Sequence, residues 1–256
     1  MKQSQTSHQK TTAVLACLLC TVVVLMPFHA FITTWIGANT GNLLLVRAWK
    51  EVLFLPAISI GIFLLLKDKN LRRVFFSEAL PWLILTYALW QFFTAGLHSR
   101  DADSLLLGLT IQLRIFVVFL LARIVAYYRP PSRALLKKII LIPAIGVIAV
   151  GLLQMFIVPY DFLKHFGYQK NVTIPPFFTI DDQVGKLRIV STLRGPNPLG
   201  VYLLLPLLIG IQQLKQSIAG KLSRKIMTSS VLLVATVIVL YGSHSRGAWL
   251  GAAAAA

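Results

Sequence analysis

The chain has 256 residues, of which 57% are hydrophobic and only 13% charged, and its formal net charge at pH 7 is +17. A soluble domain usually carries about 25% charged residues, so this composition excludes an ordinary soluble protein. The apolar residues form runs long enough to cross a bilayer as helices, which takes about 20 residues each, and lack the short alternating segments of a β-barrel. We therefore expect an all-α integral membrane protein, a polytopic helix bundle.

The positive charge has a regular distribution along the chain. In a soluble protein, a charge of +17 would indicate a nucleic-acid partner. Here most Lys and Arg residues fall in four clusters that alternate with the apolar runs: Lys2 with Lys10, and residues 67–73, 123–138 and 215–225. This alternation is typical of the positive-inside rule and predicts a cytoplasmic N-terminus and no nucleic-acid partner.

The first apolar run predicts a helix over Thr12–Ile32, interrupted by Pro27 and followed by a short outside segment over Thr33–Asn42. It is longer than a signal-peptide core, so we expect it to be retained. Cys17 and Cys20 have C-x-x-C spacing within it, but no second Cys or His pair accompanies them. Small apolar residues of a membrane helix are therefore favoured over a zinc site, and we predict no metal.

The next apolar runs predict helices that begin near residues 47–51 and end at 66, and that cover residues 80–97, 104–126 and 139–158. Arg47, Lys50 and Glu51 lie within about one helical turn, so an ion pair among them is feasible. Arg114 lies inside a predicted span. A buried arginine is costly there, so it either faces a partner or a wet cavity, or extends its side chain to the membrane surface.

The longest polar stretch, residues 159–197, follows five predicted spans. With a cytoplasmic N-terminus, it is therefore expected to be an extracytoplasmic loop. It leads into the turn Ser191–Gly200, which is rich in proline and glycine and carries Arg194. Asn197 is predicted to cap a helix over Leu199–Leu214, with Pro198 in its first turn.

The last long apolar run predicts a helix over Ile226–Tyr241, an outside turn over Gly242–Gly247, and the start of a further helix after that turn. Residues Ala252–Ala256 extend that helix too little to cross a bilayer. We therefore expect about seven complete spans and the start of an eighth, in a single transmembrane domain over residues 1–256 that belongs to a longer protein.

The basic residues expected on the outer face predict a substrate-binding site for an anion: Arg47, Lys50, Arg114, Arg194 and Arg246. A guanidinium group binds two phosphate oxygens at once and stays charged, so an anionic lipid such as a lipid-linked pyrophosphate is the expected ligand. Alternatives remain: Arg246 as an anchor at headgroup depth, and Arg194 paired with Asp181 or Asp182.

The candidate acid–base residues are His165 and His244, because imidazole titrates near neutral pH. Neither has a carboxylate at close spacing that would orient it, so a role in the loop or at the interface is favoured for both. The sequence lacks a phosphate-binding loop, a dinucleotide fingerprint and the common metalloprotease and hydrolase motifs. We predict no cofactor.

Two of the stretches just described, Arg194–Gly200 (RGPNPLG) and Ser245–Leu250 (SRGAWL), resemble motifs of the O-antigen ligase and polymerase superfamily of bacterial envelope glycosyltransferases. Trp49–Val52 (WKEV) is similar to a lysine-containing helix entry in that family. The order of the motifs, their membrane setting and the basic inside loops agree with the resemblance over the whole chain.

The resemblance implies a metal-independent, inverting transferase of the bacterial inner membrane. It would pass a glycan from undecaprenyl pyrophosphate to a lipid or saccharide acceptor on the outer face, with membrane lipid as its surroundings. Arg246 would engage the pyrophosphate and stabilise the leaving group, beside the expected substrate-binding residues Arg194, Asn197, Lys50, Arg47 and Arg114. The family's catalytic histidine lies in a later loop that this sequence does not contain, so we expect the fragment by itself to be inactive. His244 is not that histidine by position.

Three alternatives stay open at this point. A polysaccharide polymerase of the same superfamily would show the same motifs. A small-anion transporter would show acidic residues or unwound helices near the bilayer midplane, and neither is clear in the sequence. A non-catalytic membrane scaffold that binds lipid or partners would lack the later histidine-bearing loop.

Overall fold

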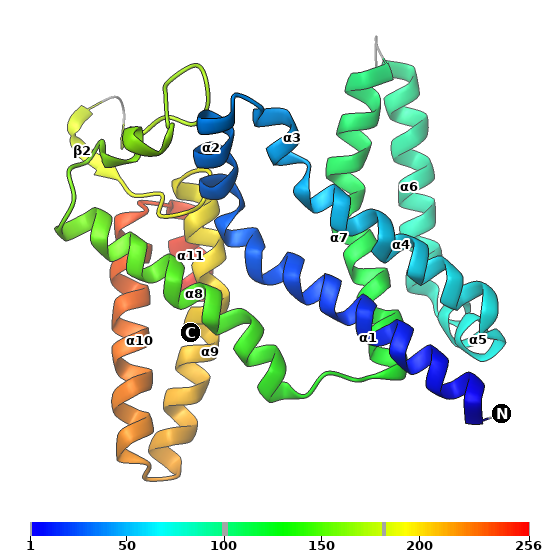
Figure 1. Ribbon diagram of the computed structural model, residues 1–256. Coiled ribbons are helices and arrows are strands. Elements are labelled where there is room, and N and C mark those ends of the chain that lie inside the picture. Colours follow the sequence, from blue (N-terminus) through cyan, green and yellow to red (C-terminus); the bar gives the residue numbers. More distant parts are fainter. Residues whose placement is uncertain (1, 99–101, 181–182, 256) are drawn as a thin grey trace. The chain divides into compact units, whose positions relative to one another are not determined.

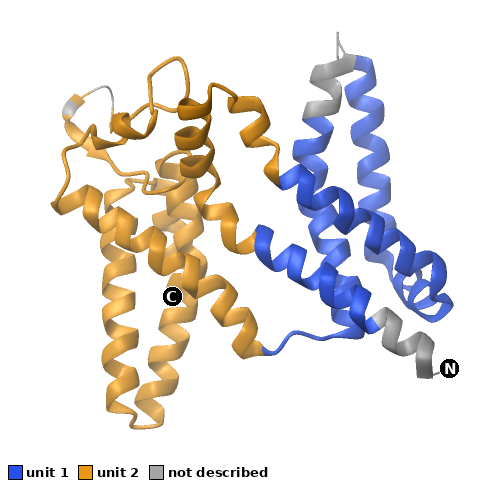
Figure 2. Cartoon of the chain, in the orientation of Figure 1, with its two compact units in different colours: residues 1–22, 50–132 blue, residues 23–49, 133–256 orange. Residues whose placement is uncertain are grey.

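The computed structural model describes residues 2–98, 102–180 and 183–255 (Figure 1). In these ranges the chain is helical apart from irregular loops and one two-stranded sheet. Seven helical segments are long and apolar enough to cross a membrane, so the chain is a multi-pass membrane protein. It divides into two compact units, residues 1–22 with 50–132, and residues 23–49 with 133–256 (Figure 2).

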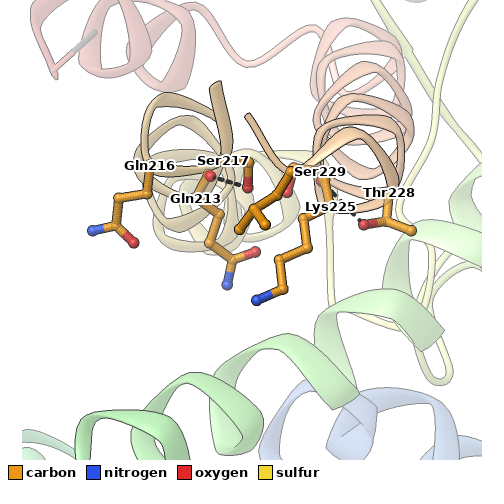
Figure 3. Close-up of a pocket in the computed structure, with 7 residues that line it drawn as sticks. Gln213, Gln216, Ser217, Lys225, Thr228 and Ser229 are labelled. Atoms are coloured by element: carbon orange, nitrogen blue, oxygen red, sulfur yellow. Dashed lines mark hydrogen bonds between the residues drawn. The ribbon is translucent and has the colours of Figure 1, made fainter. Parts of the chain in front are cut away.

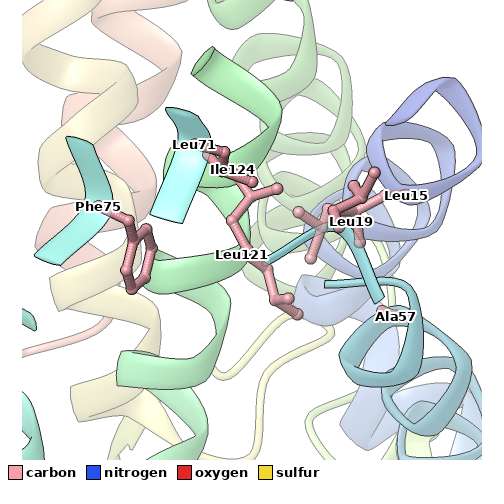
Figure 4. Close-up of a cluster of buried hydrophobic side chains, with 8 residues drawn as sticks. Leu15, Leu19, Ala57, Leu71, Phe75, Leu121 and Ile124 are labelled. Atoms are coloured by element: carbon pink, nitrogen blue, oxygen red, sulfur yellow. The ribbon is translucent and has the colours of Figure 1, made fainter. Parts of the chain in front are cut away.

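The first unit consists of most of helix α1 together with four later helices: α1 (Lys2–Leu25), α4 (Trp49–Lys67), α5 (Lys69–Ser77), α6 (Ala79–His98) and α7 (Ala102–Tyr128). Its buried core is a cluster of aliphatic and aromatic side chains from α1, α4, α5 and α7 (Figure 4). Gly61 lets α4 approach α7 closely, because a Cβ at this position would lie 2.4 Å from Cδ2 of Leu121. The predicted helices that correspond to α4, α6 and α7 are confirmed here, with ends that differ by a few residues, whereas the first helix begins at Lys2 and not at the predicted Thr12.

Helix α5 was not predicted, because the charged segment 67–73 indicated a loop. Asp68 starts the helix by accepting hydrogen bonds from the backbone amides of Asn70 and Leu71, at 2.9 and 3.1 Å. Its other carboxylate oxygen accepts a hydrogen bond from the Tyr128 hydroxyl at 2.6 Å. Leu71 and Phe75 are buried one turn apart, so α5 is an amphipathic helix with its basic residues exposed.

The second unit contains the remaining elements: η1 (Met26–Phe28), α2 (His29–Thr40), α3 (Leu43–Arg47), α8 (Arg133–Phe156), η2 (Phe162–Phe166), β1 (Phe178–Ile180), β2 (Gln183–Arg188), α9 (Pro196–Ala219), α10 (Ser223–Gly242) and α11 (Arg246–Ala255). Helices α8, α9 and α10 pack along one another, with α11 against the start of α9. Their shared core includes the fully buried Val147, Leu199, Leu203 and Val239. Gly151 of α8 allows this packing, since a Cβ there would lie 2.6 Å from a methyl group of Val239.

The predicted end of the first helix at Ile32 is wrong, because the helical path continues to Thr40. Pro27 lies in the short 3₁₀ turn η1, at a position where its missing amide hydrogen breaks no helical bond. Thr33 and Thr40 donate their hydroxyl hydrogens to backbone carbonyls one turn earlier, so these polar side chains are satisfied within α2. The left-handed Gly41 then ends the helix.

The predicted loop over residues 159–197 has a hydrophobic core of its own. Leu163, Tyr168, Ile174 and Val190 are buried together against aromatic residues of the loop and of α2. Gly167 has a φ of 78°, and a Cβ there would lie 2.2 Å from the Cβ of Ala38, so the loop packs directly on α2. Strands β1 and β2 are antiparallel, which fixes the segment immediately before the Ser191–Gly200 turn.

Candidate functional site

The turn that precedes α9 is fixed to α8 by hydrogen bonds. Ser191 has a left-handed backbone with φ 53°, and its amide donates to Oε1 of Gln154 at 2.6 Å. The Ser191 hydroxyl donates to the backbone carbonyl of Val147 at 2.6 Å, and the Thr192 hydroxyl donates to the carbonyl of Pro27 at 2.9 Å. Because these groups are buried, losing one partner would leave a buried polar group unsatisfied, and the turn is therefore rigid.

The start of α9 differs from the prediction in one respect. Gly195 is the N-cap, Pro196 occupies the first helical position, and Pro198 lies in the first turn as expected. Asn197 is not the cap, because it lies inside the helix. Its side-chain oxygen Oδ1 instead accepts a hydrogen bond from Nη2 of Arg188 at 2.7 Å.

The turn between α10 and α11 is held by serine and aromatic side chains. The Ser243 hydroxyl donates to the carbonyl of Leu240 at 2.7 Å and accepts from the Ser245 amide at 3.3 Å. His244 has a φ of 48°. Its ring lies 5.5 Å from the Tyr241 ring and 5.9 Å from the Trp249 ring, which themselves stack with an interplanar angle of 4°. Arg246 follows at the first position of α11.

The two motif segments touch each other at Gly200. A Cβ added there would lie 2.6 Å from the Cβ of Ser245 and 2.8 Å from the Cβ of Ala248, which is closer than real side chains approach. Only a glycine therefore allows the first turn of α9 to pack on the start of α11. The two motif segments, about 50 residues apart in the sequence, therefore pack directly against each other.

Arg188, at the end of β2, joins the two turns by hydrogen bonds. Its Nε donates to the carbonyl of Ser243 at 3.0 Å, and its Nη2 donates to the carbonyl of His244 at 3.3 Å as well as to Asn197. The neighbouring Ile189 amide donates to the carbonyl of Gly242 at 3.1 Å. Arg188 was not predicted as a site residue, because its partners lie far away in the sequence and are mostly backbone carbonyls.

The electrostatic surroundings of Arg188 favour an anion. Burial lowers the pKa of Arg188, and the positive charge of Arg246 lowers it further, so the two guanidinium groups are close enough to repel each other. Arg194 and Arg246 are exposed. No acidic residue of the described ranges forms an ion pair with these three arginines. Moreover, the sequence from Gln183 to Ala256 contains no Asp or Glu at all.

The predicted pairing of Arg194 with Asp181 or Asp182 concerns two acidic residues outside the described ranges, so it stays a prediction.

The other predicted site residues belong to different parts of the chain. Arg47 is exposed at the end of α3 in the second unit, whereas Lys50 and Arg114 belong to the first unit. Arg114 Nη2 contacts Oε1 of Glu51 at 2.6 Å. Arg114 therefore faces a partner within the protein, as one of the two predictions had it, and does not extend to the membrane surface unpaired. A single cavity for all five basic residues stays a prediction.

The candidate histidines lack an orienting carboxylate within the described ranges. His165 is exposed in η2, and His244 lies against aromatic rings. The nearest carboxylate in sequence to His165 is Asp161, which pairs with Lys164, and this hydrogen bond lowers the pKa of Asp161.

Cys17 and Cys20 are free thiols. Within the part of the chain that the structure describes, no group of three or more His, Cys, Asp or Glu residues is placed to hold a metal ion.

This arrangement of cations can hold a phosphate-like anion. Two rigid turns meet at Gly200, Arg188 joins them, and Arg194 and Arg246 are exposed on them. Comparison of the chain with protein-family models, with curated proteins and with solved structures gave no match in any of the three.

Proposed function

We propose that the joined turns bind the pyrophosphate of a lipid-linked glycan, and that the chain is part of an envelope glycosyltransferase similar to O-antigen ligases. In this proposal the N-terminus is cytoplasmic, and the turns face the outer side of the bacterial inner membrane. The glycan would pass from undecaprenyl pyrophosphate to a lipid or saccharide acceptor. The observation that carries the proposal is the direct packing of the two motif turns, with three arginines around them and no described acid paired to any of the three.

The chemistry of the transfer suits this arrangement. The pyrophosphate gains negative charge as the glycosidic bond breaks, and fixed cations lower the free energy of that transition state. Arg246 is the residue proposed to contact the leaving group, at the N-terminus of α11 where backbone amides also favour an anion. Arg188 is proposed as a positioning residue, because it donates hydrogen bonds to the carbonyls of Ser243 and His244, in the turn that leads to Arg246.

A binding experiment tests this proposal without requiring turnover. The chain in lipid nanodiscs is titrated with undecaprenyl pyrophosphate, and with undecaprenol as the uncharged reference. We expect Arg246→Ala to weaken binding of the pyrophosphate about tenfold or more, because a charge-assisted hydrogen bond contributes roughly 1.5–3 kcal/mol. Binding of undecaprenol should not change.

The matched control is Arg133→Ala, which removes an exposed arginine from the start of α8. It should bind undecaprenyl pyrophosphate like the wild-type protein. If Arg246→Ala and the wild-type protein bind it equally, the pyrophosphate site is elsewhere.

The same site would serve a polysaccharide polymerase, which differs in its acceptor and not in its donor. It would also suit a small-anion transporter, in which case proteoliposomes containing the chain should accumulate phosphate and empty liposomes should not.

A further inference from the structure

The hairpin that joins α9 to α10 contains a polar pocket, at the other end of α9 from the motif turns. Helix α9 has 24 residues and is therefore about 36 Å long. The pocket has a volume of about 400 Å³. Six of its seven lining residues are polar: Gln213, Gln216, Ser217, Lys225, Thr228 and Ser229, with Leu222 as the seventh (Figure 3).

The three hydroxyl groups of this pocket differ in their hydrogen bonds. Ser217 and Thr228 donate their hydroxyl hydrogens to backbone carbonyls of their own helices. Ser229 is only 6% exposed, yet its hydroxyl has no hydrogen-bond partner among the described residues. Because Ser229 lines the pocket and its oxygen is not sealed from solvent, its hydroxyl can form a hydrogen bond with a molecule that enters the pocket.

The charge around the pocket selects an anion. Lys225 lines it, and Lys221 and Arg224 lie on the same hairpin. The sequence from Gln183 onward has no acidic residue that could neutralise them. In addition, α10 begins without a side-chain cap, so the backbone amides of its first turn add donors beside Lys225.

The position of the pocket selects a lipid as the source of that anion. The hairpin joins two helices that are each long and apolar enough to span a membrane, over Pro196–Ala219 and Ser223–Gly242. We therefore expect a pocket at the end of both spans to lie near the depth of the lipid phosphates, where basic residues near a span attract anionic headgroups.

We propose that this pocket binds the headgroup phosphate of an anionic membrane lipid. Lys225 supplies the charge, and the Ser229 hydroxyl and the Gln213 amide supply hydrogen bonds to the phosphate oxygens. Figure 3 shows that the lining side chains come from both helices of the hairpin. The site is separate from the proposed pyrophosphate site and does not depend on it.

The test measures phosphatidylglycerol bound to the purified chain by native mass spectrometry, over a titration with that lipid. Phosphatidylcholine serves as the zwitterionic reference. We expect Lys225→Gln to weaken phosphatidylglycerol binding about fivefold, since one basic residue near the surface contributes about that factor. Ser229→Ala should weaken it by roughly threefold or more through the lost hydrogen bond. Both variants should bind phosphatidylcholine like the wild-type protein.

Lys215→Gln is the matched control, because Lys215 is exposed on the same hairpin region but does not line the pocket. If Lys215→Gln and Lys225→Gln weaken binding equally while Ser229→Ala has no effect, diffuse charge alone attracts the lipid and the pocket proposal fails. Glycerol 3-phosphate should displace the bound lipid in the wild-type protein. Binding of glycerol 3-phosphate without any retention of phosphatidylglycerol would overturn the assignment to a lipid.

Discussion

Arg188 uses its planar guanidinium to reach three acceptors on two separate turns, namely two backbone carbonyls and the Asn197 side chain. A lysine in the same place would keep the charge but has no fork of fixed donors. We expect Arg188→Lys to lower the free energy of unfolding by about 2 kcal/mol, because the two carbonyls lose a charged hydrogen-bond donor. Thermal unfolding followed by circular dichroism would measure this change.

Arg194→Lys is the control for this substitution, since Arg194 is exposed and forms no ion pair with a described acid. It should leave the unfolding temperature unchanged. An Arg188→Lys protein as stable as the wild type would show that the turns are held together without Arg188.

Tyr168 provides a second prediction at the scale of one residue. Its side chain is buried in the loop core, and its hydroxyl has no hydrogen-bond partner within the described ranges. Burial raises the pKa of Tyr168. Because the pKa in the folded state lies above that in the unfolded state, the neutral phenol gives its full stability below about pH 10, and this stability is lost as the pH rises further.

We therefore expect Tyr168→Phe to be as stable as the wild-type protein at neutral pH, or more stable, since no hydrogen bond is removed. It should also lose part of the wild-type decline in stability above about pH 10. Thermal unfolding at pH 7 and at pH 10.5 would measure both effects. Tyr160→Phe, at an exposed position, should keep the wild-type pH dependence.

At the scale of elements, the contact between α9 and α11 depends on Gly200. We expect Gly200→Ala to destabilise the second unit by roughly 1–3 kcal/mol, because its methyl group would overlap the side chains of Ser245 and Ala248. Gly247→Ala is the matched control on α11, since a Cβ there meets no atom within 4 Å. Limited proteolysis and thermal unfolding would distinguish the two variants. Equal stability of both would mean that the helices separate easily.

The sequence predicted long elements well and local contacts poorly, for identifiable reasons. Apolar runs such as those of α4 and α10 predict helices, because a helix that crosses a membrane needs about 20 apolar residues. Helix α5 escaped prediction because its apolar residues, Leu71 and Phe75, are separated by basic ones, and only the Asp68 cap would have indicated a helix start. The first motif turn was visible as a proline–glycine pattern, and the second as a polar break with two glycines at the end of an apolar run.

The contacts that make the site could not be derived in the same way. Arg188 binds carbonyls 55 and 56 residues later in the chain, and backbone carbonyls leave no trace in a sequence. Asn197 looked like a helix cap, yet Gly195 followed by Pro196 fills that role and leaves Asn197 to accept from Arg188.

At the scale of the whole molecule, the orientation in the membrane follows only from the distribution of basic residues. The positive-inside rule predicts that the loop containing His165 faces outward and that the hairpin containing Lys221 faces the cytoplasm. We expect a cysteine at position 165 to react with a membrane-impermeant maleimide in intact cells. A cysteine at position 221 should react only after the membrane is permeabilised.

This labelling requires a background in which Cys17 and Cys20 are replaced by alanine, since both are free thiols. Both test positions are exposed, so a lack of labelling reflects the membrane barrier and not burial. Labelling of position 221 in intact cells, with protection of position 165, would reverse the orientation and place the joined turns on the cytoplasmic side.

The positive charges of Arg188 and Arg246 lie close enough to repel each other, which links ligand binding to the stability of the fold. Two like charges are held near each other by the fold, with no acid from Gln183 onward to relieve their repulsion. Under the proposed function, an anion bound beside both guanidinium groups would offset part of this repulsion. Because a ligand that binds only the folded state raises the free energy of unfolding, the proposed ligand would stabilise the contact between the two turns.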